Sequence, residues 1–323
     1  MSEAPIKSDL HPRNRFRSGY DFDALRACCD ELVPHVAPNK HGNLSIDFAD
    51  PSAVKALNGA LLSHAYGLGA WDLPPGALCP PIPGRSEHLH HLADLLRDDR
   101  SEREGHDGDG VPRGPQVSVL DIGAGASCIY PLIGASEYGW RFVASELEPA
   151  AHHWSIKLVN AHPALKGLIA CRLQSSAARC FEGVVRPGEL FDLSMCNPPF
   201  HGSAKEAAEG NQRKRRGLGG RRGRAGRSTK GSRNFGGQGN ELWCPGGEVG
   251  FVQRMITESA ERRELCSWFT TLVSQRAHLP ELSRALAVVE PVEVRVLDMA
   301  HGQKQSRILA WTFRESDARR VPR

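Results

Sequence analysis

The second half of the chain alternates short apolar runs with stretches in which apolar residues recur at helical spacing. Short apolar runs bounded by turn residues are typical of buried strands, and a 3.6-residue period is typical of helices. Strands are predicted at 117–122, 141–146, 168–173, 191–196, 265–273, 292–297 and 307–313. Helices are predicted at 248–264 and 279–289. This alternation predicts an α/β protein built on a twisted open sheet of seven strands.

The N-terminal part of the chain is predicted to be a helical portion ahead of the sheet. Residues 20–33 have helical apolar spacing, and Asp50, followed by a proline, has the sequence of a helix start. The proline-rich residues 79–85 are predicted to be a stiff, extended lead into a helix at 86–97. Arg85 would then be held in a defined place, as suits a residue that binds a carboxylate or a phosphate. The alternative is a surface arginine near a helix start.

A glycine turn follows the first predicted strand of the sheet. The strand closes with Asp121 and Ile122, and Gly123 and Gly125 form a Gly-x-Gly turn, which in a doubly wound sheet lies at the ligand-binding crevice. Cys128 stands where the third glycine of a dinucleotide fingerprint would be, which favours a nucleoside ligand without a pyrophosphate. Glu146 ends the second strand, where a carboxylate can accept both ribose hydroxyls. Its alternative role is to cap the helix that follows.

A second turn, Asn-Pro-Pro-Phe, follows the strand at 191–196. Two prolines cannot continue a strand ladder, so they fix a stiff turn. The oxygen of Asn197 and the carbonyl of Pro198 can accept both hydrogens of a planar amine such as N6 of adenine, while Phe200 stacks on the ring. The alternative is a strand end with a core phenylalanine. Because both turns follow strands of one parallel sheet, we expect them to face the same crevice.

Charge is concentrated in one segment. The chain carries a net charge of +4, yet ten Lys or Arg and no Asp or Glu lie between residues 211 and 233. Without these ten, the 41 basic residues fall to 31 against 37 acidic ones. Residues 201–245 are therefore predicted to be a flexible basic insertion that grips RNA, and a solvated segment is the alternative. The RNA-binding residues expected here are Arg213, Lys214, Arg215 and Arg216.

A short basic arm lies near the N-terminus, at residues 10–17. Arg13 and Arg15 of this arm are predicted to contact RNA phosphates, because arginine is a bidentate phosphate donor. A solubilising terminus is the alternative. With this arm, residues 1–97 are predicted to be an N-terminal helical, RNA-contacting portion. The main domain is expected at 117–323, after a charged, glycine-rich linker at 98–116.

Composition narrows the setting of the protein. The nine cysteines show no Cys-x-x-Cys pair, there is no apolar signal-peptide core, and no apolar stretch is long enough to span a membrane. These features favour a cytoplasmic protein with free thiols and no membrane association. His88, His90 and His91 lack the Cys or Glu that would complete a zinc site, so no metal is predicted.

The two turns resemble those of class I S-adenosylmethionine-dependent methyltransferases that modify adenine N6. More closely, the chain resembles the bacterial large-subunit rRNA adenine-N6 methyltransferase F family, which is related to the eukaryotic methyltransferase of U6 small nuclear RNA. The resemblance covers nearly the whole chain. It is carried by residues 10–15, 83–85, 120–134, 196–201, 234–237, 241–244, 246–249 and 302–307.

The resemblance implies a Rossmann-like fold and a role for each motif. S-adenosylmethionine would be the methyl donor, with no metal. Its methionine carboxylate would be held by Arg85 and its ribose by Glu146. The adenine to be methylated would enter the turn from Asn197 to Phe200. The donor pocket would be completed by Asp121, Gly123, Gly125, Ser127 and Asn197. Gln174-Ser175-Ser176 stand where an acid often contacts the donor adenine, so that contact is unassigned.

The implied activity is S-adenosylmethionine-dependent N6-methylation of a single adenine, position 1618, in 23S ribosomal RNA, by a monomer. The arginine and glycine enrichment between residues 218 and 230 departs from the family pattern. One alternative is a protein-glutamine N-methyltransferase, because a side-chain amide could occupy the same two acceptors. Another is a non-catalytic RNA-binding ribosome-assembly factor that keeps the fold without the reaction.

Overall fold

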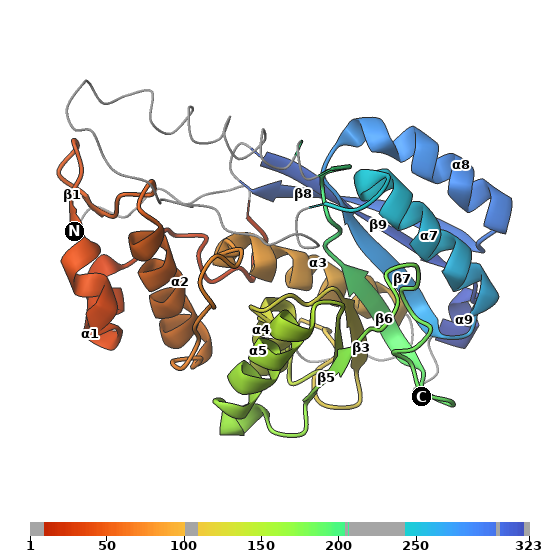
Figure 1. Ribbon diagram of the computed structural model, residues 1–323, viewed down its shortest axis with the longest axis horizontal. Helices are drawn as coiled ribbons and strands as arrows, with labels where there is room; N and C mark the ends of the chain where they lie inside the picture. The colour runs from red at the N-terminus through yellow and green to blue at the C-terminus, as the bar shows by residue number, and fades with distance from the viewer. Residues whose placement is uncertain (1–9, 101–108, 204–205, 207–242, 302–303, 320–323) are drawn as a thin grey trace.

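A seven-stranded sheet forms the centre of the fold. The structure is a computed structural model, and it describes residues 10–100, 109–203, 206, 243–301 and 304–319. In the described part of the chain the main sheet has seven strands in the order β5-β4-β3-β6-β7-β9-β8 (Figure 1). Their bounds are β3 Ser118–Ile122, β4 Arg141–Glu146, β5 Ile169–Leu173, β6 Phe191–Cys196, β7 Cys266–Val273, β8 Glu293–His301 and β9 Lys304–Thr312. The predicted seven-stranded α/β sheet is confirmed.

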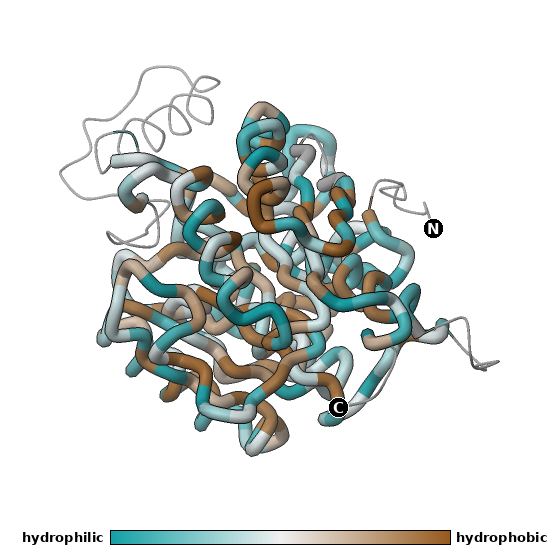
Figure 2. The backbone as a smooth tube through the Cα atoms, turned by 90° about the vertical axis from the view of Figure 1, so that its right-hand side faces the viewer, coloured by the Kyte–Doolittle hydropathy of each residue, from teal (hydrophilic) through white to brown (hydrophobic). Residues whose placement is uncertain are grey.

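Five neighbouring strands, β5 to β7, run parallel, and β9 pairs antiparallel with both β7 and β8. Strand β3 lies in the middle, with β4 on one side and β6 on the other. Both β6 and β7 are buried along their whole length, as parallel strands covered by helices on both faces require. Figure 2 shows hydrophobic segments crossing the interior of the molecule, with hydrophilic segments more frequent at its periphery.

Helices cover the two faces of the sheet. One face packs on α4 Ile129–Tyr138 and α5 Pro149–Asn160, which connect the parallel strands β3, β4 and β5. The opposite face packs on α7 Gly247–Glu261 and α8 Leu279–Val289 (Figure 1). Shorter elements complete this part: the 3-10 helices η2 Pro163–Leu165 and η4 Arg276–His278, and helix α9 Ser316–Arg319.

The N-terminal portion is helical, as expected, and shares one hydrophobic core with the sheet. Its elements are α1 Phe22–Cys28, η1 Asp30–His35, the short strands β1 Ala37–Pro38 and β2 Leu44–Ser45, α2 Pro51–Tyr66 and α3 Ile82–Arg100. Asp50 caps α2, and its side chain accepts the N–H of Ser52 at 2.9 Å. Leu89 and Leu92 of α3 are fully buried in the shared core.

Helix α3 corrects one sequence prediction. It begins at Ile82 and not at residue 86, so the supposed extended lead to Arg85 is the first turn of the helix. Proline is compatible with this turn because its missing N–H has no helical partner there. The helix also continues to Arg100, so the expected boundary between residues 97 and 98 falls inside it. Asp99, in its last turn, is buried and accepts the indole N–H of Trp268 at 2.5 Å.

No helix of the described residues is long and apolar enough to cross a membrane. Within the same residues, no group of three or more His, Cys, Asp or Glu is arranged to hold a metal ion. His88 and His90 are instead buried in α3, and burial lowers the pKa of both imidazoles. His90 contacts the hydroxyl of Tyr138 at 2.5 Å.

Candidate active site

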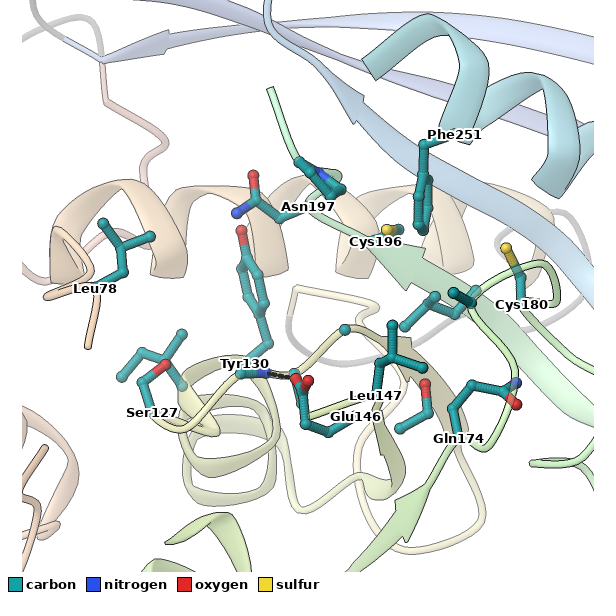
Figure 3. Close-up of a pocket in the computed structure, with 18 of the residues that line it drawn as sticks. Leu78, Ser127, Tyr130, Glu146, Leu147, Gln174, Cys180, Cys196, Asn197 and Phe251 are labelled. Carbon is teal, nitrogen blue, oxygen red and sulfur yellow. Dashed lines mark hydrogen bonds between the residues drawn. The ribbon is translucent and has the colours of Figure 1, made fainter. Parts of the chain in front are cut away.

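The glycine turn and the Asn-Pro-Pro-Phe turn meet at one edge of the sheet. Strands β3 and β6 are adjacent and parallel, and their register pairs Ile122 with Cys196, the last residue of each strand. The residues that follow, Gly123 and Asn197, line the same pocket, in which Figure 3 shows Asn197 beside Tyr130. The predicted meeting of the two turns is therefore observed.

Glycine backbone forms the floor of this pocket. Gly123 and Gly125 have φ of 75° and 66°, which favour glycine, and a Cβ on Gly123 would meet no atom within 4 Å. The N–H of Gly123 donates to the carbonyl of Ser145 at 3.0 Å, which ties the turn to the end of β4. Ser127 also lines the pocket, as predicted. A ligand can thus approach the backbone closely.

Glu146 is fixed at the end of β4 by two backbone bonds. Its carboxylate accepts the N–H of Gly125 at 2.8 Å, marked by the dashed line in Figure 3, and the N–H of Glu148 at 2.8 Å. Burial raises the pKa of this carboxyl group. Neither donor is an N–H of helix α5, which begins at Pro149 after Glu148, so the alternative role as a helix cap is not observed. The ribose contact stays a prediction.

Asp121 is a buried carboxyl group without a hydrogen-bond partner among the described residues. Only 1% of the residue is exposed, and both carboxylate oxygens lack a donor. Burial raises its pKa from 3.8 to about 8, an effect that Arg85 opposes and Glu146 reinforces. Asp121 does not itself line the pocket, although Ile122 and Gly123, which follow it, do. A buried acid without a donor can pair with a cationic group of a ligand that enters beside it.

Arg85 projects from the first turn of α3 to the junction of the two turns. It donates from Nη1 to the Tyr130 hydroxyl at 2.6 Å, and its guanidinium lies 5.1 Å from the centre of that ring. The hydrogen bonds of the Asn197 amide are satisfied when its Oδ1 faces the guanidinium. In this orientation Oδ1 accepts from Nη1 at 3.0 Å and from Nη2 at 3.2 Å. Nε of Arg85 is buried without a partner in the described structure. This unused N–H can serve an incoming carboxylate.

The Asn-Pro-Pro-Phe turn is only partly inside the pocket. Asn197 and Pro199 line it, while Pro198 is buried and Phe200 is half-buried outside the lining residues. An aromatic ring that the sequence analysis missed, Phe251 of α7, points into the pocket toward Cys196 (Figure 3). Its place could not be foreseen, because an isolated phenylalanine on a helical stretch is most simply a core residue.

Two other contributors were also missed. Tyr130 orients Arg85 but lies in an apolar helical stretch that gives no sign of this role. Glu258 of α7 is buried, and its carboxylate accepts the backbone N–H groups of Cys180, Phe181 and Glu182 at 2.6, 3.1 and 2.7 Å. It thereby holds a loop of which Cys180 lines the pocket, beside Gln174 and Ser176.

The basic arm lies on the protein and not in solvent. Arg13 donates to Asp94 at 2.6 Å, to the carbonyl of His90 at 3.0 Å and to the Tyr138 hydroxyl at 3.3 Å, and 17% of its side chain is exposed. These partners give Arg13 a structural role, and its phosphate contact stays a prediction. Arg15 is half-exposed and pairs with Glu137 at 2.8 Å.

Arg213, Lys214, Arg215 and Arg216 lie outside the described residues. The two ends of the basic insertion are nevertheless placed. The N–H of Cys244 donates to the carbonyl of His201 at 3.0 Å, and His201 pairs with Trp243 in an isolated bridge. His201 and Cys244 are therefore held together, with His201 directly after Phe200 in the chain.

Comparisons with known proteins agree along the whole chain. Residues 4–315 match the family model described as RNA methyltransferase. The ribosomal RNA large subunit methyltransferase F of Yersinia enterocolitica (serotype O:8, biotype 1B) is 51% identical over 308 residues, 95% of this chain and 88% of the relative. The protein of the same name from Yersinia pestis (strain Pestoides F) is 50% identical over 307 residues, with the same coverage.

Solved structures of METTL16 are similar to this chain over nearly its whole length. The hMettl16 catalytic domain in complex with the MAT2A 3'UTR hairpin 1 superposes with a TM-score of 0.76 at 30% identity, covering 95% of this chain and 96% of that one. The N-terminal domain of human METTL16 in complex with SAH superposes with a TM-score of 0.71 at 26% identity, covering 95% and 99%.

Proposed function

Because the chain belongs to the RNA methyltransferase family, we propose that it transfers a methyl group from S-adenosylmethionine to N6 of one adenine in 23S ribosomal RNA. The observation that carries the proposal is the shared pocket of the two turns, with Gly123 on one side and Asn197 on the other. The name of the Yersinia relatives supports a large-subunit rRNA substrate, and family resemblance supports adenine 1618 as the position.

The donor half of the pocket fits S-adenosylmethionine, which supplies an electrophilic methyl group on a sulfonium. Its α-carboxylate and α-ammonium require one cationic and one anionic partner close together. The buried Nε of Arg85 and the buried oxygens of Asp121, neither of which has a hydrogen-bond partner among the described residues, are such a pair. Gly123, Gly125 and Ser127 would lie along the ligand, and Glu146 would accept the ribose hydroxyls. The N-terminal domain of human METTL16 in complex with SAH supports S-adenosylmethionine as the donor.

The acceptor half would be formed by the Asn-Pro-Pro-Phe turn. The Asn197 oxygen and the Pro198 carbonyl would accept the two N6 hydrogens and offset the positive charge that develops on the amine as the methyl group arrives. Alignment of the amine with the donor would supply much of the remaining rate. Phe200 would stack on the base, and Phe251 offers a second apolar wall. The adenine must leave its helix to reach this site.

The basic insertion would hold the RNA beside this acceptor site. Its two described ends are joined by the hydrogen bond between Cys244 and His201, and the sequence places ten Lys or Arg between them. Electrostatic contacts of this kind bind the phosphate backbone without reading sequence. The selected adenine would then be specified by the shape of the rRNA and by the pocket.

The experiment is a methyl-transfer assay on 23S rRNA with Asn197→Ala and the native protein. We expect the variant to lose transfer by about 10²-fold or more, since removal of one charge-stabilising group typically costs that much. S-adenosylhomocysteine should still bind, as measured by calorimetry. Mass spectrometry of rRNA digests from cells with and without the gene identifies the methylated position. Normal turnover by the variant would refute the proposed role of Asn197. Methyl transfer to protein but not to rRNA would refute rRNA as the substrate.

A further inference from the structure

The N-terminal arm folds into a tight turn on the first turns of α3. The N–H of Asn14 donates to the carbonyl of His11 at 2.8 Å, and Asn14 is 3% exposed. Farther along the helix, Asp94 accepts from Arg13 at 2.6 Å and contacts Nε2 of His11 at 2.7 Å. His11, Arg13 and Asn14 belong to the basic arm that was predicted to contact RNA, but their polar groups point into the protein.

The contacts of the arm bracket Arg85. The Asn14 amide donates from Nδ2 to the carbonyl of Pro83 at 3.0 Å and to the carboxylate of Glu87 at 2.8 Å. Glu87, which is 1% exposed, also accepts the N–H of His11 at 2.9 and 3.0 Å. One buried amide therefore joins the residues two positions before and two positions after Arg85.

The first turn of α3 depends on such contacts. Gly84 sits beside Arg85, and glycine costs a helix about 1 kcal/mol relative to alanine because it has more backbone freedom to lose. Hydrogen bonds to the first turn from another segment restrict that freedom. The backbone of Arg85 sets where its guanidinium lies against Tyr130 and Asn197.

We propose that the arm is a positioning device for the methyl-donor site, with Asn14 as its central positioning residue. It acts by holding the first turn of α3 so that Arg85 presents its free Nε to the donor carboxylate. The inference rests on the proposed function, since it takes the ligand of Arg85 to be S-adenosylmethionine. It gives the arm, of which Arg13 and Arg15 were predicted to contact RNA, a role in donor affinity.

The first test compares Asn14→Ala with Arg15→Ala, a neighbouring residue whose side chain is half-exposed and pairs with Glu137 on α4. We expect Asn14→Ala to raise the Kd for S-adenosylhomocysteine about tenfold, equivalent to about 1.4 kcal/mol. The rate at saturating donor and the salt dependence of rRNA binding should stay at the native values. Arg15→Ala should leave the Kd for S-adenosylhomocysteine unchanged. An unchanged donor Kd with a reduced salt slope in Asn14→Ala would overturn the inference.

The second test needs no variant and so does not depend on the folding of Asn14→Ala. Coupling free energies are reciprocal, so if the arm strengthens donor binding, the bound donor must stabilise the arm. Hydrogen exchange followed by mass spectrometry should show slower exchange in residues 11–17 when S-adenosylhomocysteine is present, although these residues lie outside the pocket. The amides of Phe16 and Arg17, which donate to the side chain and the carbonyl of Asn14, report this change.

Residues 279–289 of α8 are the internal control and should be unaffected. Protection of residues 123–130 without protection of residues 11–17 would overturn the inference and leave the proposed function standing. If S-adenosylhomocysteine protected neither segment, the proposed function itself would fail.

Discussion

At the scale of single residues, Arg85 connects the two turns of the site. Its guanidinium donates to Tyr130, which lies in the helix after the glycine turn, and to Asn197, the first residue of the other turn. The carboxylate of Asp121 is left without a hydrogen-bond donor, although Arg85 is close enough to lower its pKa. Occupation of the donor site would therefore satisfy groups that the free protein leaves unpaired.

Asp121 predicts a pH dependence of donor binding. Its pKa is raised by burial to about 8, so the carboxyl group is mostly protonated in the free protein at neutral pH. The α-ammonium of the donor favours the ionised form, so binding below pH 8 must release a proton. We expect the affinity for S-adenosylhomocysteine to rise between pH 6 and pH 8, by up to about tenfold per unit, and to level off above pH 8.

Calorimetry in buffers of different ionisation enthalpy measures both the affinity and the released proton. Asp121→Asn is the matched control: it should bind more weakly and show a flat profile over the same range. If the affinity of the native protein did not change with pH, Asp121 would not be the partner of the donor ammonium. The stability of the free protein should change in the opposite direction to donor affinity. Because the pKa of Asp121 is higher in the folded than in the unfolded chain, the free energy of unfolding falls as pH rises from about 4 to about 8.

At the scale of elements, the strands were predictable and the start of α3 was not. The apolar runs at β3, β4, β6 and β7 are nearly continuous because both faces of these strands are buried, and such runs are visible in a sequence. The prolines before Arg85 indicated extended chain, although proline also fits the first turn of a helix. Only the packing of α3 in the core decides between these readings.

Helix α4 gives a prediction at this scale, through Gly134. A Cβ at this position would lie 2.7 Å from Cε2 of Phe142 on β4 and nearer still to its Cζ, so Gly134→Ala overpacks the interface of helix and sheet. We expect a loss of about 1–3 kcal/mol in the free energy of unfolding, measured in urea. Gly59→Ala on α2 is the control: a Cβ there meets nothing within 4 Å, and the helix should gain about 0.5–1 kcal/mol. Equal effects of the two substitutions would contradict the packing argument.

At the scale of the whole molecule, the fold and the family foreseen from the motifs are confirmed. The shared pocket followed from the rule that parallel strands bring their carboxyl ends to one edge. The role of the arm could not be foreseen in this way. Asn14 meets Glu87 and Arg13 meets Asp94 across 73 and 81 residues of sequence, and neither pairing leaves a local pattern.

The basic insertion gives the prediction that concerns the whole molecule. Replacing residues 211–233 by a neutral glycine-serine segment of the same length removes ten cations. The slope of log affinity against log salt should then become shallower, by up to about seven if every cation meets a phosphate of single-stranded RNA. A variant with the same 23 residues in scrambled order is the control and should keep the native slope, because this contribution depends on charge. If the slope did not change after the replacement, the segment would not take part in RNA binding.

The register of β3 against β6 has a consequence for how this site can vary. A shift of one residue between the two strands would displace Asn197 from Gly123 by about 3.3 Å along the sheet, as well as exchanging the faces of β6. In the proposed reaction, the hydrogen bonds between β3 and β6, and not the loops, would therefore set the distance between the methyl group and the acceptor nitrogen. The loops around the pocket could then change in length and alter which RNA is recognised. The distance over which the methyl group is transferred would stay the same.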